Sequence, residues 1–244
     1  MTGTAPAGPH FFVDPADVDR DRVVLRGDEG RHLATVLRAR PGQRVSLADG
    51  TGRRYAARVR RAYDDAVTLA VEHVEDDPPA RPALTVVHAL PKARKLDDVV
   101  QRLSEVGVER LVPVVSARTE VALSVEKAER ALARWRAVAL AAAKQSRRAR
   151  VLEIAEVGVW STALASAPGD GVVCWEGATT PLREVLPADP DALVLGIGPE
   201  GGLTADEVEA TGLPAASLGP TILRTETAAL VAVTAVLTLT GRLG

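Results

Sequence analysis

The sequence has few of the residues that build disulfides and metal sites. Cys174 is the single cysteine among 244 residues, which excludes a disulfide within the chain and suits a reducing cytoplasm. The four histidines are scattered, without the spacing of metal ligands and without cysteines to join them. We therefore expect a cytoplasmic protein with no zinc site.

Aromatic residues and long apolar runs are scarce as well. Phenylalanine, tyrosine and tryptophan make up 3% of the chain, too few for the rows of rings on which single-strand binders stack bases. No long uncharged apolar run lies near the N-terminus, so we expect neither a signal peptide nor a membrane span. The apolar stretch 228–239 is too short to cross a bilayer and predicts a buried helix or a subunit interface.

Positive charge, by contrast, is concentrated in two places. The net charge of −2 conceals a segment 20–61 with twelve arginines and four acids, and a segment 130–150 with seven cations and no acid. Genomic bias toward arginine is an alternative explanation, although it does not account for the clustering. Segregated charge of this kind is typical of proteins that bind a polyanion such as nucleic acid.

A linker is expected at 76–82, where three prolines and two acids do not suit a helix or strand. It predicts two domains, 1–77 and 78–244. In the first, one helix is expected at 28–37, with Leu33, Val36 and Leu37 on one side. Short β-forming runs and an Asp-Gly turn indicate a small barrel. These segments are 44–48, 49–52 (the turn), 54–59 and 66–71.

The second domain alternates apolar strand-like runs with segments of helical periodicity. Continuous apolar runs are typical of parallel strands buried on both faces, so this order predicts an α/β domain with a parallel sheet. The expected strands are 84–90, 110–115, 171–175 and 192–195. Helices are expected at 95–106, in a long alanine-rich segment ending near Gln145, and after a capping box at 204–207.

Two glycine-bearing turns follow each other closely, at 196–202 and 218–227. The first has the Gly-x-Gly-x-x-Gly spacing of dinucleotide-binding loops, but no acid follows about twenty residues later to hold a ribose. Glu200 also lies inside this loop, where its carboxylate would repel a pyrophosphate. A tight turn without a ligand remains the alternative for one loop, whereas two in tandem favour a pocket for a ligand that has no phosphates.

Four motifs occur together in this chain, at 101–107, 143–146, 198–202 and 218–228. The set resembles the bacterial small-subunit ribosomal RNA uridine methyltransferase family of the SPOUT superfamily, and the similarity extends to 31–42. The resemblance implies a PUA-like N-terminal β-barrel for RNA, a trefoil-knotted SPOUT domain, S-adenosylmethionine as methyl donor and a homodimer. The implied product is a uridine methylated on ring nitrogen 3 in the rRNA of assembled 30S particles.

One position departs from the family pattern. Family members often have glycine after the pair Gln145–Ser146, whereas this chain has Arg147. The backbone conformation of that position is therefore open.

The resemblance assigns the methyl-donor pocket to the two glycine loops. The residues expected to bind the cofactor are Leu195, Gly196, Gly198, Pro199, Glu200, Gly201, Gly202, Leu218, Gly219, Ile222, Leu223 and Thr227. Arg224 is expected to stabilise the anion that forms when uridine loses its imide proton, with Glu226 as proton acceptor or orienting group. The structural alternatives are that Thr225 caps the last helix, that Glu226 suits its N-terminus, and that Arg224 pairs with Glu226.

Two groups of mainly cationic residues are expected to bind RNA phosphates. Contacts to phosphates position a substrate without reading its sequence. These residues are Arg26, Arg31, His32, Arg38 and Arg54 in the barrel, and Lys92, Lys95, Arg118, Gln145 and Arg148 at the rim of the active site. A SPOUT enzyme that methylates another RNA, and a non-catalytic RNA-binding assembly protein, remain the alternative functions.

Overall fold

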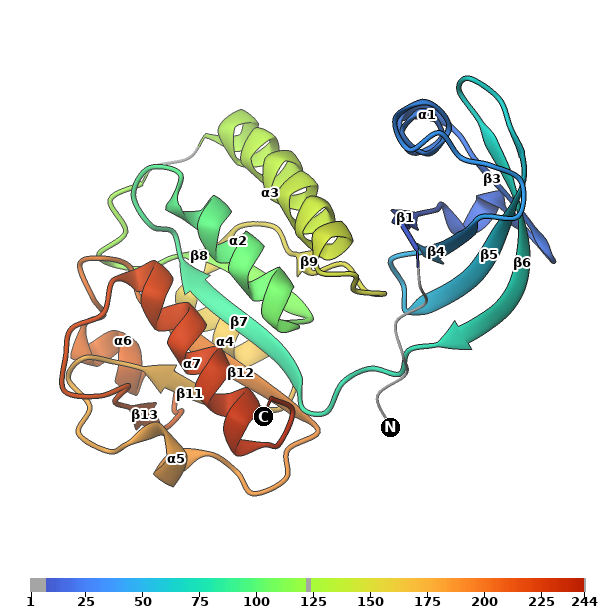
Figure 1. Cartoon of the computed structure of the whole chain (residues 1–244). Coiled ribbons are helices and arrows are strands. Elements are labelled where there is room, and N and C mark those ends of the chain that lie inside the picture. The colour runs from blue at the N-terminus through green and yellow to red at the C-terminus, as the bar shows by residue number, and fades with distance from the viewer. Residues whose placement is uncertain (1–7, 122–123, 244) are drawn as a thin grey trace. The chain divides into compact units, whose positions relative to one another are not determined.

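The computed structural model describes residues 8–121 and 124–243, and the chain divides into two compact units (Figure 1). The first unit comprises Met1–Pro79 and Ala143–Val151, and the second comprises Ala80–Ala142 and Leu152–Gly244. The short segment Ala143–Val151 thus packs with the first unit although it lies far beyond the expected linker in sequence. None of the described helices is long and apolar enough to span a membrane.

The first unit is built on a six-stranded sheet with the strand order β1-β4-β5-β6-β3-β2. The strands are β1 (His10–Phe12), β2 (Val18–Asp19), β3 (Arg22–Leu25), β4 (Arg44–Ala48), β5 (Arg53–Ala62) and β6 (Val67–Asp76). β1 and β4 run parallel, and all other neighbours are antiparallel. Alternate residues of β5, among them Tyr55, Ala57 and Val59, are buried in the core because successive side chains of a strand point to opposite faces. The three expected strands are confirmed, and the second and third are longer than expected.

The expected helix at 28–37 is present, but its second half is wider than an α-helix. After α1 (Gly27–Arg31) comes the π-helical turn η2 (His32–Val36), in which the Leu37 N–H donates to the His32 carbonyl at 3.0 Å. A short turn, η1 (Pro15–Asp17), precedes both. The expectation that Val36 and Leu37 share the buried side with Leu33 is wrong, because they are 66% and 40% exposed. The i→i+5 hydrogen bond rotates side chains away from the 3.6-residue spacing on which that expectation depended.

The second unit contains a parallel sheet with the order β10-β8-β7-β12-β11-β13 and with β9 beside β8, as the alternating pattern predicts. Its strands are β7 (Ala83–Ala89), β8 (Arg110–Val115), β9 (Glu153–Ile154), β10 (Gly158–Val159), β11 (Asp170–Cys174), β12 (Ala192–Ile197) and β13 (Ala215–Ala216). Its helices are α2 (Lys95–Val106), α3 (Val125–Gln145), α4 (Trp160–Ser166), α5 (Leu182–Val185), α6 (Ala205–Glu209) and α7 (Thr225–Leu239). The capping box at the start of α6 and the left-handed Gly107 after α2 confirm two expected helix boundaries.

Helices cover both faces of this sheet (Figure 1). Trp160 and Leu164 of α4 pack on Val87 and Ala89 of β7. His88, between them in sequence, faces the opposite side, where it meets the first residue of α7. Since all strands of the sheet are parallel, their carboxyl ends meet at one edge, and the loops that follow β7, β11 and β12 gather there.

Candidate functional site

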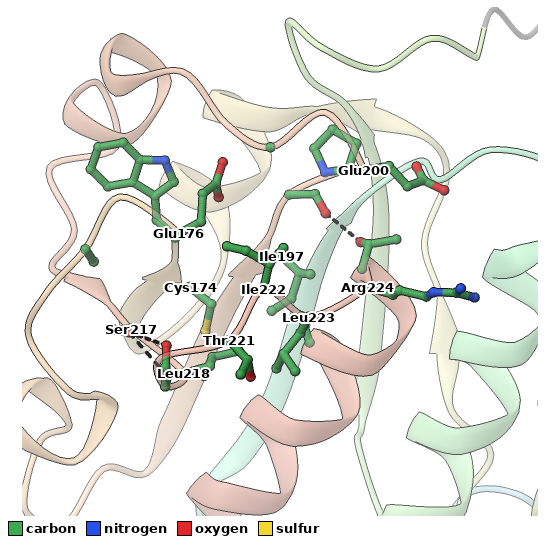
Figure 2. A pocket seen from close by; sticks show the side chains of 18 of the residues that line it. Cys174, Glu176, Ile197, Glu200, Ser217, Leu218, Thr221, Ile222, Leu223 and Arg224 are labelled. Carbon is green, nitrogen blue, oxygen red and sulfur yellow. Dashed lines mark hydrogen bonds between the residues drawn. The ribbon is translucent and has the colours of Figure 1, made fainter.

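A cavity of about 650 Å³ opens at the carboxyl edge of the parallel sheet (Figure 2). Its walls come from the end of β11 and the following turn (174–178), the loop after β12 (197–202) and the segment that leads into α7 (217–225). This volume lies within the range of about 300–1,000 Å³ that is typical of small-molecule sites. The two glycine loops identified in the sequence therefore share one pocket.

The first glycine loop favours glycine at two positions. Gly202 has φ +71°, and a Cβ there would collide with the carboxylate of Glu176. A Cβ on Gly201 would lie 3.2 Å from the Cβ of Arg118. Glycine therefore lets the backbone of this loop lie close to the side chains of Glu176 and Arg118.

A buried hydrogen bond joins the two loops. The hydroxyl of Thr225 donates to the carbonyl of Gly198 at 2.6 Å and lies 3.4 Å from Nε2 of His88. Full burial lowers the pKa of His88, so that the ring is neutral. Its Nδ1 lies 2.7 Å from the Ala89 carbonyl and carries the proton, so Nε2 faces the hydroxyl oxygen without a proton, and the single hydroxyl hydrogen goes to Gly198. The expectation that Thr225 caps α7 is wrong, because its hydroxyl bonds Gly198 and Arg224 occupies the cap position without a side-chain bond.

The first glycine loop accepts hydrogen bonds from the side chains of Lys95 and Arg118 and from the backbone of Lys92. The carboxylate of Glu200 accepts from Lys95 Nζ at 2.8 Å and from the Lys92 N–H at 3.1 and 3.2 Å. Burial acts to raise the pKa of Glu200, but these hydrogen bonds outweigh it and hold the pKa below the ordinary value. The hydrogen bond with Glu200 in turn raises the pKa of Lys95. Arg118 Nη1 donates to the Gly201 carbonyl at 3.0 Å, whereas the ammonium of Lys92 pairs with Glu120 at 2.8 Å. Of these three cations expected at the rim, Lys95 and Arg118 contact the loop through their side chains, and Lys92 contacts it through its backbone.

Arg224 and Glu226 lie at the start of α7 in different environments. The Arg224 side chain lines the cavity and is exposed, and Figure 2 shows it extending away from the apolar side chains of the second loop. Glu226 does not line the cavity. Its Oε2 is buried without a hydrogen-bond partner in the described part of the chain, 3.8 Å from Lys95 Nζ. The two side chains form no ion pair with each other in the described structure.

The cavity also contains residues that the glycine motifs did not indicate. Glu176 lies at its mouth and has no ion-pair or hydrogen-bond partner among the residues described. Cys174 lies on its floor, and burial raises the pKa of this thiol to about 12. Cys174 lies in the expected strand 171–175 and Glu176 directly follows it. The carboxyl end of this strand lies at the same sheet edge as the glycine loops, so its position in the sequence could have indicated both residues.

Most of the residues expected to bind a cofactor line this cavity. Those that do are Gly198, Pro199, Glu200, Gly201, Gly202, Leu218, Gly219, Ile222 and Leu223. Leu195, Gly196 and Thr227 do not line it. Leu195 and Gly196 are buried within β12, and Thr227 lies in the first turn of α7.

The remaining cations expected to bind RNA belong to the first unit. Arg26, Arg31, His32 and Arg38 are exposed around α1 and η2. Arg54 instead contacts the protein, because it donates to the Arg147 carbonyl at 2.8 Å and to Asp77 at 3.1 Å. Of the last two expected contacts, Gln145 is exposed and Arg148 is half-buried. Gln145 and Arg148, expected at the rim of the active site, belong to the first unit and do not line the cavity, whereas Lys92, Lys95 and Arg118 belong to the second unit.

Two sequence families match the chain in succession. The RNA methyltransferase PUA domain family matches residues 25–72, and the RNA methyltransferase domain family matches residues 78–237. Ribosomal RNA small subunit methyltransferase E of Mycobacterium bovis is 38% identical over 243 residues, covering 95% of this chain and 92% of its own length. The chain belongs to the ribosomal RNA small subunit methyltransferase E family. The Bacillus subtilis member is 30% identical, with 87% of this chain and 88% of that protein aligned.

Solved structures agree with this membership of the methyltransferase E family. The Neisseria gonorrhoeae member, crystallised bound to S-adenosyl methionine, has a TM-score of 0.83 and 30% identity over 95% of this chain and 97% of its own. A Legionella pneumophila protein in complex with the bound cofactor SAM has a TM-score of 0.81 and 25% identity, covering 94% of this chain and 96% of its own. The PUA-like first domain and the SPOUT α/β second domain expected from the sequence are therefore confirmed.

Proposed function

We propose that this protein transfers a methyl group from S-adenosylmethionine to ring nitrogen 3 of a uridine in small-subunit ribosomal RNA. The observation that carries the proposal is the cavity at the carboxyl edge of the parallel sheet, where the two glycine loops and the unpaired Glu176 meet. The family places RNA methylation on this fold, and the position of the cavity agrees with the rule that α/β sheets bind ligands beyond their strand ends.

The residues of the cavity fit S-adenosylmethionine. This donor has no phosphates and carries positive charge on its sulfonium and amino groups, so the carboxylate of Glu176 suits it, whereas a pyrophosphate would be repelled. The glycine backbone of 198–202 gives close access, and Leu218, Ile222 and Leu223 supply apolar surface for the adenine. Bound donor supplies an electrophilic methyl carbon, and the protein supplies orientation.

Arg224 is placed to act on the uridine. The imide nitrogen attacks only after it loses its proton, and a guanidinium beside the base carbonyls stabilises the resulting anion. Arg224 lines the cavity with its side chain exposed, which suits this role. Glu226 is proposed as a proton acceptor or orienting group, and its Oε2 has no hydrogen-bond partner in the described residues.

RNA contact is proposed for both units. Residues 1–77 would grip phosphates through the exposed cations around α1 and η2, and residues 78–244 would present the uridine site, with Lys92, Lys95 and Arg118 beside the first glycine loop. Segment 143–151, which packs with the first unit, would add Gln145 and Arg148. The substrate is proposed to be the assembled 30S particle in the cytoplasm, and the chain segments around the cavity are proposed to form a trefoil knot.

A homodimer is proposed on the exposed side of α7. A second, mainly apolar cavity of about 950 Å³ lies there, lined by Leu182, Leu230, Val231 and Leu239 among others. Four residues, 217–220, line both this cavity and the site cavity, so a second copy seated here would adjoin the donor pocket. Val231→Arg should yield a monomer in analytical ultracentrifugation, whereas Val159→Arg, at a 59% exposed position on β10, should not.

The function is tested by methylation of small-subunit particles that lack the modification, followed by nucleoside mass spectrometry. We expect one 3-methyluridine per particle with the wild-type chain. Arg224→Ala should lower kcat by roughly 10²–10³ while the Kd for S-adenosylmethionine, from calorimetry, stays within about twofold. Arg102→Ala, on α2 and outside the described cavities, is the control. Methylation of ribose or of tRNA instead, or no heat on adding S-adenosylmethionine, would favour one of the alternative functions.

A further inference from the structure

A third cavity, of about 470 Å³, lies in the second unit between the loop after β7 and helix α3. The loop contributes Leu90 and Arg94, and α3 contributes Arg130 and Trp135. None of its described lining residues belongs to the site described above. Figure 1 shows α2 and α3 lying side by side, and both begin at this cavity.

The floor of this cavity is apolar. Leu90, Leu96 and Trp135 are each 3% exposed, and Ala131 is 6% exposed. Ala131 and Trp135 are four residues apart and therefore lie on the same face of α3. The Nε1 of Trp135 is buried and has no hydrogen-bond acceptor in the described part of the chain. The floor offers a flat apolar surface of the kind that holds a ring.

The rim of the cavity is cationic. Four cations line it: Arg94, Lys127, Arg130 and Arg134. Its described lining residues include no acidic residue. Arg134 is neutralised by Asp97, whose two carboxylate oxygens each lie 3.0 Å from its Nε. The other three side chains make no ion pair or hydrogen bond with another described residue. Glu126 and Glu129 lie on the same helix but do not line the cavity.

The ends of two helices add to this positive charge. α2 begins at Lys95 and α3 at Val125, so that Leu96 and Lys127 bring the first turns of both helices to the cavity. Arg94, at the N-cap of α2, makes no side-chain capping bond. Helix N-termini favour anions through their free N–H groups and dipoles, and phosphate is one of the anions that bind there.

We propose that this cavity holds a nucleotide of the RNA substrate that flanks the target uridine, with its base on the apolar floor and a phosphate on the cationic rim. The inference rests on the proposed function for the identity of the RNA. The loop that forms one wall also supplies the Lys92 N–H, which donates to Glu200 of the first glycine loop. The same loop therefore contacts both this cavity and the proposed methyl-donor site. A nucleotide held here orients the strand that enters that site.

Two variants test the proposal by separating charge from shape. Arg130→Ala removes one unpaired cation, and Ala131→Phe fills the floor. We expect each to weaken binding of a small-subunit rRNA fragment about tenfold in fluorescence anisotropy. Arg130→Ala should also reduce the slope of log K against log salt by about 0.7. Arg102→Ala is the matched control for lost charge, and calorimetry with S-adenosylmethionine should give an unchanged Kd for all three variants.

Several results would overturn the inference. RNA affinity that falls no further in Arg130→Ala than in Arg102→Ala, or that is unchanged in Ala131→Phe, contradicts a nucleotide in this cavity. If free uridine monophosphate binds saturably to the wild-type chain, both variants abolish that binding, and RNA affinity is unchanged, the cavity is a free-nucleotide site instead. The proposed function can fail while this inference stands. In that case the wild-type chain binds the rRNA fragment more tightly than Arg130→Ala does, but it forms no 3-methyluridine in small-subunit particles.

Discussion

The hydroxyl of Thr225 donates a 2.6 Å hydrogen bond to the carbonyl of Gly198 and thereby joins the two glycine loops. Thr225 is 5% exposed, and neutral His88 lies on the other side of its hydroxyl. Residues that are 27 positions apart in sequence are thus fixed relative to each other at the site. We expect the shape of the proposed donor pocket to depend on this bond, because each loop supplies one wall.

Thr225→Val keeps the shape of the side chain and removes the hydroxyl, which leaves the Gly198 carbonyl without its donor. We expect the Kd for S-adenosylmethionine to rise roughly tenfold, since an unsatisfied buried acceptor costs about 1–3 kcal/mol. Thr225→Ser retains the hydroxyl and should bind within about twofold of wild type. Isothermal titration calorimetry measures both. Equal affinities for the valine and serine variants would show that the bond does not shape the pocket.

Much of the architecture was predictable because it depends on local patterns. The helix 95–106 has its buried face at 3.6-residue spacing and ends at Gly107, whose φ of +93° a glycine accepts easily. The parallel sheet followed from continuous apolar runs. The π-helical turn after α1 was not predictable, because the change from i→i+4 to i→i+5 bonding leaves no periodic pattern in five residues.

The site was predictable in part, for a related reason. The glycine loops are continuous in sequence, so their motifs indicated them directly. His88 lies in β7 and Glu176 in the turn after β11, and only the pairing of β7 with β12 and of β12 with β11 brings them to the loops. Capping of its own helix, the structural alternative for Thr225, is a local role, whereas its actual partner Gly198 is distant in sequence.

Glu176 is expected to contribute to donor binding through its charge. Its carboxylate lines the cavity beside Gly202 and has no protein partner among the described residues. Glu176→Gln should raise the Kd for S-adenosylmethionine by at least tenfold, because hydrogen bonds to charged groups contribute about 1.5–3 kcal/mol. Glu184→Gln, an exposed acid on α5 that pairs with Arg183, is the control for lost charge. An unchanged Kd in calorimetry would remove Glu176 from the binding site.

The same titration with S-adenosylhomocysteine locates the contact. This product lacks the sulfonium charge but keeps the ribose and the amino group. A larger loss of affinity for the donor than for the product would place Glu176 near the sulfonium, and equal losses would place it on the ribose or the amino group.

Cys174 should be inert in the native protein. Burial raises the pKa of its thiol from an ordinary 9.0 to about 12, so almost no thiolate forms between pH 6 and 9, and the side chain is 8% exposed. We expect reaction with a disulfide reagent to be slow at pH 8, to accelerate with urea, and to slow further with S-adenosylmethionine, because Cys174 lines the donor cavity. Ser161→Cys in a Cys174→Ala background, at an exposed position of α4, should react at once. Fast labelling of native Cys174, independent of urea, contradicts its burial.

Arg147 occupies a backbone conformation that favours glycine. Its φ is +56°, in the left-handed region, where a residue with a Cβ costs about 1–2 kcal/mol. The Arg147 carbonyl accepts from Arg54 at 2.8 Å, so the turn is held in place despite the strain.

Arg147→Gly should therefore be more stable than Arg147→Ala. Both variants lack the guanidinium, so the difference in their free energies of unfolding reports the backbone alone. Relief of the left-handed strain exceeds the extra entropy of glycine in the unfolded chain, which leaves a net difference of about 1 kcal/mol in favour of glycine. Urea unfolding with equal m-values measures it. A glycine variant no more stable than the alanine variant would mean that the chain relaxes this turn at no cost, and that the positive φ of Arg147 carries no strain.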